Sequence, residues 1–247
     1  MSIDLSPEIR VSHKLIINIW QEMKSDREFE RLCRESGLPS WYVDEAYEPR
    51  WYNGPRPDDV KVLFLMAEPG AITKNERKNL KPAISNEGWP AQDSVTEKQQ
   101  ENYWRKHLYQ LCSEVWPEDT RAKMNQYLAG SCTFWASLPS NEEAKHRSIN
   151  LNQTSQVPRR VADYFLKKYL GRFLAIFPAS TIVVAAGLTK AKSRLDRLEE
   201  VTAVPVKQRV KTCIALTKPA ATGKRAKESW SRVGREVRQM LERGDTV

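Results

Sequence analysis

The sequence has few of the residues on which metal and nucleophilic chemistry depends. Among 247 residues there are 3 His and 4 Cys, and the cysteines (Cys33, Cys112, Cys132 and Cys213) form no C-x-x-C pair. Neither an H-E-x-x-H sequence nor a glycine-rich phosphate loop is present, and no Ser-His-Asp order can be assembled. The common zinc, iron–sulfur, P-loop and triad sites are therefore excluded. We expect no metal or cofactor, and buried free thiols.

Long apolar runs are also missing. The sequence holds no apolar run of about 18 residues, the length from which a membrane span is considered. The first residues, Met1 to Pro7, lack the charged and apolar regions of a secretory signal. We therefore expect a soluble, cytoplasmic protein with no membrane partner, and a monomer.

The composition that is present favours one large core and a polyanionic partner. Apolar residues make up 40% of the chain, which includes 8 Trp. The 40 Lys and Arg exceed the 31 Asp and Glu, for a formal net charge of +9. A chain of this length can bury one substantial core, and a positive balance attracts nucleic acid above other partners. The charge therefore favours a polyanionic partner, with nucleic acid as the first candidate.

Short apolar runs alternate with helical periodicity along the chain. The runs are rich in β-branched and aromatic residues, as in strands covered on both faces; they span residues 60–66, 132–138, 181–186 and 212–216. Helical spacing is found over residues 6–37, 94–115, 121–128, 158–173, 188–198 and 226–240. Strands separated by helices imply a parallel sheet. The predicted fold is a three-layer α/β/α sandwich with a central four-stranded, mostly parallel sheet and an N-terminal helical cover.

The chain divides by pattern into two parts of one structural unit. Residues 1–57 contain two helices and an irregular, aromatic, turn-rich segment packed on the core. The second helix begins at the capping pattern Ser25-Asp26-Arg27-Glu28. Residues 58–247 form the α/β/α domain. In the helix over 188–198, Leu195 and Leu198 are predicted to point inward and Arg194 outward.

The first strand ends at a carboxylate. Glu68 follows the apolar run 60–66, and Pro69 and Gly70 come directly after it. Ligands of parallel sheets bind outside the carboxyl ends of the strands, so Glu68 is a candidate functional residue. The alternative is a turn in which Glu68 caps a helix or remains solvated.

Basic residues gather just after the predicted strand ends and at helix starts. Cations and helix N-termini in these places suit phosphate. The candidate DNA-binding residues are Lys74, Arg77, Lys78, Arg159, Arg160, Lys190, Thr222, Lys224, Arg225 and Lys227. For any one of them a solvated surface position is an alternative, but the whole set favours one shared basic face.

Three segments resemble motifs of the uracil-DNA glycosylase superfamily. Ala67-Glu68-Pro69-Gly70 matches the last four positions of that family's first motif, and Lys218-Pro219-Ala220 stands in place of its second motif, H-P-S. The turn over residues 183–191 is similar to the family's strand-to-helix turn. The resemblance spans roughly residues 58–243 and implies an α/β/α DNA glycosylase. The partner that it implies is DNA, duplex or single-stranded.

The resemblance implies roles for two residues. Glu68 would orient or deprotonate the attacking water, and Lys218 would stabilise the departing base. As alternatives, Lys218 would be a Schiff-base nucleophile or would contact only a phosphate. Both residues follow the carboxyl ends of predicted strands.

The departures from the family pattern argue against plain uracil as the substrate. Met66 replaces the customary glycine, Lys218 replaces a histidine, and the run 134–137 lacks the asparagine that commonly reads the uracil edge. Small residues around the motifs suggest a site roomy enough for a modified pyrimidine, including a bulky one. The predicted substrate-binding residues are Ala67, Pro69, Gly70, Trp89, Trp135 and Ser137. Trp89, Trp135 and Tyr52 are candidates for stacking on an extruded base, with a core position as the alternative for each.

The expected function is hydrolysis of an N-glycosidic bond in DNA, in base-excision repair or in defence against modified foreign DNA. Two other functions remain open: a catalytically silent DNA-binding module of the same fold, and a hydrolase of free nucleosides.

Overall fold

The computed structural model describes residues 7–36, 52, 54–66, 103–135, 158–186, 193–202, 210–213 and 224–243. Its helices and strands, in chain order, are α1 (Pro7–Lys24), α2 (Arg27–Glu35), η2 (Pro57–Asp59), β1 (Val62–Met66), α6 (Tyr103–Val115), α7 (Thr120–Tyr127), β2 (Leu128–Cys132), α10 (Arg159–Phe165), η4 (Leu166–Leu170), α11 (Gly171–Ala175), β3 (Ile182–Ala186), α12 (Ser193–Thr202), β4 (Val210–Cys213) and α13 (Lys224–Arg243).

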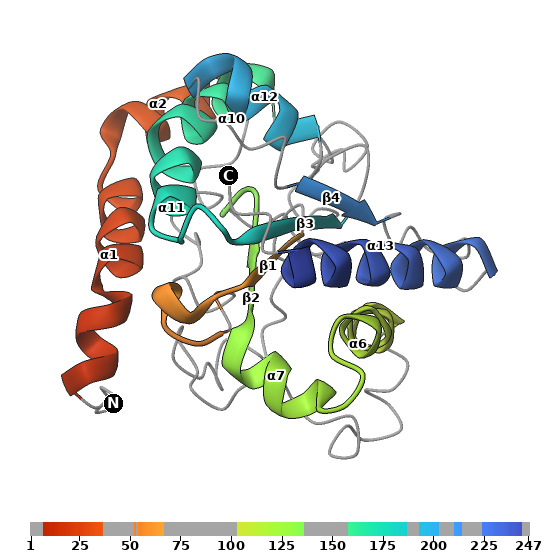
Figure 1. Ribbon diagram of the computed structural model, residues 1–247. Helices are drawn as coiled ribbons and strands as arrows, with labels where there is room; N and C mark the ends of the chain where they lie inside the picture. Colours follow the sequence, from red (N-terminus) through yellow and green to blue (C-terminus); the bar gives the residue numbers. More distant parts are fainter. Residues whose placement is uncertain are drawn as a thin grey trace, which may run out of the picture.

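The described strands form one parallel sheet (Figure 1). They lie in the order β2-β1-β3-β4, and every neighbouring pair is parallel. The chain moves from β1 to one edge and later, from β3, to the other, so the direction of winding changes between β1 and β3. The prediction of an α/β fold with parallel strands is therefore confirmed.

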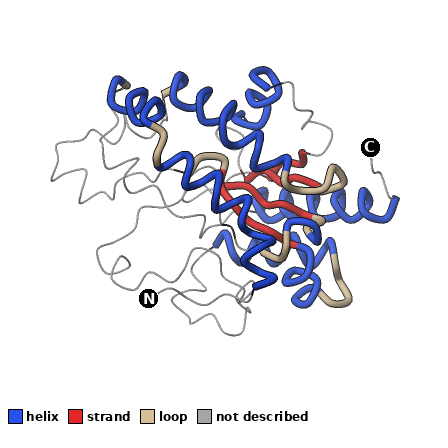
Figure 2. Tube along the Cα trace, turned by 90° about the vertical axis from the view of Figure 1, so that its left-hand side faces the viewer, coloured by secondary structure: helices blue, strands red, loops and turns tan. Residues whose placement is uncertain are grey.

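Successive side chains of the strands enter two separate cores. Leu63, Leu65 and Val183 belong to one core, while Phe64 and Val184 belong to the other. Helices α1, α2, α10, α11 and α12 lie over the first face of the sheet, and α6, α7 and α13 lie over the second (Figures 1 and 2). Connections that run in opposite directions thus cross on opposite faces, as right-handed crossovers require.

The second strand lies earlier in the sequence than predicted. It covers Leu128–Cys132 rather than residues 132–138. Its small residues allow a close neighbour: a Cβ added to Gly54 would lie 2.7 Å from the Cα of Ala129. Phe134 and Trp135 follow the strand and are fully buried, so their apolar character reflects helix packing instead of strand pairing. The fourth strand is also earlier, at Val210–Cys213 rather than 212–216.

The start of the second helix differs by one residue from the predicted capping pattern. The N-cap is Asp26, whose Oδ1 accepts hydrogen bonds from the backbone N–H groups of Glu28 and Phe29 at 3.0 and 3.3 Å. The hydroxyl of Ser25 instead donates to the carbonyl of Gln21, so Ser25 belongs to the end of α1. A carboxylate accepts from the helix N-terminus more strongly than a hydroxyl does.

Helices α6 and α13 approach most closely at Gly234. A Cβ at this position would lie 2.6 Å from the carbonyl oxygen of Leu111 and 2.7 Å from Cβ of Glu114. Alanine normally stabilises a helix interior by about 1 kcal/mol relative to glycine. Here we expect Gly234→Ala to lower the free energy of unfolding by about 1–3 kcal/mol, because the helices must separate. Urea unfolding measures the change.

The matched control is Gln239→Ala, an exposed position on the same helix. It should change the free energy of unfolding by less than about 0.5 kcal/mol. A Gly234→Ala protein as stable as the wild type would contradict the close approach of α6 and α13.

Candidate functional site

The carboxyl edge of the sheet is the candidate site. Met66 and Cys132, the last residues of β1 and β2, are register partners, and Ala186 ends β3. In open α/β sheets, ligands bind at this edge where the winding direction changes, which here is between β1 and β3. Glu68 follows Met66 by two residues in the sequence, and Lys218 follows Cys213 by five. Both residues lie outside the part of the chain that the structure describes.

A buried cation is the main polar feature of the described edge. Arg194, the second residue of α12, is 9% exposed, and its Nη1 donates to Oγ1 of Thr133 at 3.3 Å. The guanidinium carbon lies 5.5 Å from the ring centre of Phe134. The backbone N–H of Thr133 donates to the carbonyl of Met66 at 2.8 Å, which fixes this group to the end of β1.

The outward position predicted for Arg194 was wrong. The helical period places Arg194 beside the apolar Leu195, and charge alone suggested solvent. The structure instead buries the guanidinium, which lies over the ring of Phe134 and donates to the hydroxyl of Thr133. Both residues directly follow β2. No local pattern signals this contact between residues 61 positions apart.

Two predicted DNA-binding residues are at the start of α10. The side chains of Arg159 and Arg160 are 78% and 60% exposed. Arg159 lies 3.9 Å from a carboxylate oxygen of Asp163, and Arg160 lies 3.1 Å from one of Glu35. Exposed ion pairs of this kind contribute only about 0–1 kcal/mol. These two ion pairs therefore add little to the stability of the fold.

Of the remaining predicted site and DNA-binding residues, three lie in a described helix and the others lie outside the described residues. Lys224, Arg225 and Lys227 lie in the first two turns of α13, which follows β4. Outside the described residues lie Glu68, Lys218, Ala67, Pro69, Gly70, Trp89, Ser137, Lys74, Arg77, Lys78, Lys190 and Thr222.

Trp135 is a core residue. It is fully buried, and its indole N–H donates to the carbonyl of Cys132 at 3.2 Å. Phe165 and Phe173 contact its ring at centroid distances of 5.4 and 5.3 Å, both close to perpendicular. These contacts correct the assignment of Trp135 to substrate stacking and agree with the core alternative. Tyr52 is likewise fully buried.

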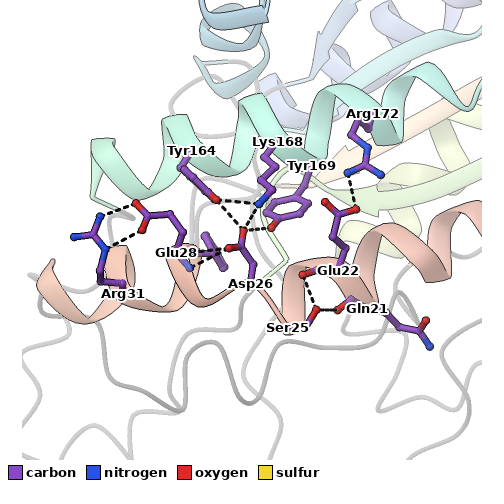
Figure 3. A network of polar contacts seen from close by, with 11 residues as sticks. Gln21, Glu22, Ser25, Asp26, Glu28, Arg31, Tyr164, Lys168, Tyr169 and Arg172 are labelled. Atoms are coloured by element: carbon purple, nitrogen blue, oxygen red, sulfur yellow. Dashed lines mark hydrogen bonds and ion pairs between the residues drawn. The ribbon is translucent and has the colours of Figure 1, made fainter.

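The densest polar cluster of the described residues joins α2 to the helix opposite it (Figure 3). The Oδ2 atom of Asp26 accepts hydrogen bonds from the hydroxyls of Tyr164 and Tyr169 and from Nζ of Lys168. The bonds from Tyr164 and Lys168 measure 2.9 and 2.8 Å. Lys168 and Tyr169 belong to η4, a π-helical turn inside the predicted helix over 158–173.

The pKa values of Asp26 and Lys168 show that the two side chains form a stable ion pair. Burial alone would raise the pKa of Asp26, but the donors from Lys168, Tyr169 and Tyr164 outweigh it and lower the pKa to about 2. The bond to Asp26 raises the pKa of Lys168 to about 12. Neither group titrates near neutral pH, and a carboxylate this fully occupied is a poor general base. The cluster therefore holds α2 in place.

Two further predictions concern thiols and metals. Cys33, Cys112 and Cys132 are buried free cysteines, as predicted. Burial raises the pKa of the Cys33 thiol to about 12, which suppresses its nucleophilic form. Within the described ranges, no three His, Cys, Asp or Glu side chains are grouped so that they could hold a metal ion.

None of the described helices is long and apolar enough to cross a membrane. No protein-family model, curated protein or solved structure matches the chain.

Proposed function

We propose that the protein is a DNA N-glycosylase that removes a modified pyrimidine base. The observation that carries the proposal is the place of β1 in the sheet. β1 pairs with β3 on one side and β2 on the other, and the winding direction changes between β1 and β3. The carboxylate predicted from the sequence, Glu68, follows the end of this strand by two residues.

The proposal includes the finer fold. We infer a three-layer α/β/α sandwich with a four-stranded parallel sheet, in which α1 and α2 are the N-terminal helical cover. The two cores on opposite faces of the sheet support the layers. Phe29 of α2 packs against Phe134 and Phe165 at centroid distances of 6.2 and 6.1 Å, which supports one structural unit for residues 1–57 and 58–247.

The proposed reaction needs one base and one cation. Glu68 accepts a proton from a water molecule as the water oxygen forms a bond to C1′ of the deoxyribose. The bond between C1′ and the base nitrogen breaks, and its electron pair leaves with the base. Lys218 stabilises the resulting anion, which takes up a proton from solvent, while Glu68 releases the proton that it accepted back to solvent. An alternative route begins with attack of a neutral Lys218 amine on C1′, which displaces the base together with the electron pair of its glycosidic bond. The C1′–O4′ bond then breaks and leaves its electron pair on O4′, which takes up a proton, and this gives a Schiff base between Lys218 and the opened sugar.

The charge of the chain supports DNA as the substrate. A net charge of +9 attracts a polyanion, and Arg159 and Arg160 are exposed at the start of α10. Binding through such cations releases counterions from DNA, so it weakens steeply with added salt. We propose a monomer that acts in the cytoplasm, in repair or in defence against modified foreign DNA.

The missing asparagine and histidine favour a base other than uracil. An enzyme acting on a base in duplex DNA must extrude it from the stack, which is easiest for a mismatched or damaged pair. Since Trp135 and Tyr52 are buried, Trp89 is the remaining predicted stacking residue. Its contact with the base is part of the proposal.

The test is a panel of short duplexes, each with one modified pyrimidine, incubated with the protein and treated with alkali to cleave abasic sites. We expect strand scission in at least one modified duplex and none in the unmodified duplex. The same panel as free nucleosides should show no release of base, because polymer contacts contribute to binding.

Two outcomes would replace the proposal. Salt-sensitive binding without scission of any duplex would indicate a silent DNA-binding module. Release of base from free nucleosides, insensitive to salt, would indicate a nucleoside hydrolase.

A further inference from the structure

A groove lies between α2 and the continuous helical run of α10 and η4. It encloses about 510 Å³ and is lined by Glu28 and Leu32 of α2 and by Arg160, Asp163, Tyr164 and Lys167 of the opposite run. The last four residues are spaced by three, one and three positions, so they share one face of their helix. The groove therefore joins this charged face to α2.

The two carboxylates of the groove are already bonded to arginines. Glu28 accepts from Nε and Nη2 of Arg31 at 2.8 and 2.6 Å, as Figure 3 shows. Asp163 accepts from Nε and Nη2 of Arg197 at 3.0 and 2.8 Å. Arginine–carboxylate pairs with two parallel bonds are the strong form of the ion pair. Neither carboxylate is thus a free acceptor for a cationic ligand.

The two cations of the groove are less committed. Lys167 is exposed, and its side chain forms no hydrogen bond or ion pair with any residue that the structure describes. The side chain of Arg160 is 60% exposed and lies 3.1 Å from a carboxylate oxygen of Glu35. An exposed pair of this kind contributes only about 0–1 kcal/mol, so exchanging Glu35 for another anion costs little. The charge that the groove offers to a ligand is therefore positive.

We propose that this groove binds the backbone of one strand of DNA, with Arg160 and Lys167 each in contact with a phosphate. Seven positions separate the two residues, which is roughly 10 Å along a helix axis. At ~3.4 Å per nucleotide of one strand, this spacing corresponds to about three nucleotides. The choice of DNA as the occupant rests on the proposed function, whereas its negative charge follows from the groove itself. Helix α2 is then part of the DNA interface.

The first experiment measures binding of a short unmodified DNA duplex to the full chain over a range of salt concentrations. Lys167→Ala and Arg160→Ala should each weaken binding and reduce the slope of log K against log salt by about one, because each removes a phosphate contact. The matched control is Lys14→Ala, which removes an exposed lysine of α1, outside the groove. Its slope should equal that of the wild type.

A second pair of variants changes the charge in the opposite direction. Glu28→Gln removes a carboxylate that lines the groove and should strengthen duplex binding, because Arg31 loses its partner and repulsion of the phosphates falls. Glu242→Gln makes the same change on α13 and should not alter binding. No binding of the duplex by the wild type, or equal effects of the groove variants and their controls, would overturn the proposal.

The same titrations with polyglutamate identify the class of occupant. Polyglutamate should bind more weakly than the duplex at equal salt. If it binds as tightly and loses as much affinity in Lys167→Ala, the groove takes an acidic polypeptide, and its assignment to DNA is wrong. None of these measurements uses base excision, so a failed excision assay leaves them intact. Excision by a protein whose groove variants bind the duplex as the wild type does would overturn the groove alone.

Discussion

Replacing Asp26 by alanine should lower the free energy of unfolding by about 3–5 kcal/mol. One carboxylate caps α2 and accepts hydrogen bonds from Tyr164, Lys168 and Tyr169, and only 7% of its side chain is exposed. Removing it leaves the Lys168 ammonium beside two hydroxyls that have lost their acceptor. The lost helix cap accounts for about 0.5–2 kcal/mol of the change.

Glu28→Ala is the control for Asp26→Ala. It removes a carboxylate from the same helix, but the Glu28 side chain is 45% exposed and pairs only with Arg31 in the described part of the chain. Its effect should stay below about 1 kcal/mol. Urea unfolding at neutral pH compares the two variants, and equal effects would show that the Asp26 cluster does not hold α2 to the core.

The Asp26 cluster should also set part of the acid stability. The pKa of Asp26 falls from 3.8 to about 2 on folding, so the stabilisation from its ionised form is fully present above pH 3.8. It is lost as the pH falls through about 2, and amounts to about 2 kcal/mol. Asp26→Asn lacks this contribution, so its free energy of unfolding should fall less steeply than that of the wild type between pH 5 and about 2. Parallel curves would contradict the ion pair.

The sequence predicted correctly the strands that can be recognised from their own residues. β1 and β3 are continuous apolar runs, and each was placed within two residues of its observed start. The predicted position of β2 was too late in the sequence because the strand consists mostly of small residues, including Gly130, and lacks the apolar run typical of a buried strand. The strand packs closely against a remote segment, since Gly54 lies against Ala129. The sequence around residues 128–132 gives no sign of that contact.

Of the candidate site, the sequence could predict only the residues that directly follow the ends of apolar strands. An acidic residue after an apolar run marks a candidate ligand edge, and the position of β1 in the sheet is consistent with that rule. The burial of Arg194 depends on Thr133 and Phe134, which come from a different strand connection. The partners of Asp26 are similarly remote, although the capping pattern did mark the helix start where Asp26 lies. Long-range polar contacts of this kind need the fold before they can be identified.

Under the proposed mechanism, Glu68→Gln should reduce base excision by about 100- to 10,000-fold, the range that a general base contributes. The amide keeps the size and polarity of the carboxylate but neither accepts the proton of the attacking water nor offsets the positive charge that develops on the sugar. Single-turnover measurement on the modified duplex identified by the panel separates this chemical step from product release. Binding of the same duplex, and its salt dependence, should match the wild type.

Glu242→Gln supplies the matched control for Glu68→Gln, because it makes the same substitution on an exposed side chain of α13 that pairs with Arg238. Its excision rate should equal that of the wild type. If Glu68→Gln excises the base at an unaltered rate, Glu68 has no part in the mechanism, and the carboxylate must come from another residue. A parallel loss of excision and of DNA binding would instead assign Glu68 a structural role in the turn after β1. Only loss of excision with intact binding supports the proposed general base.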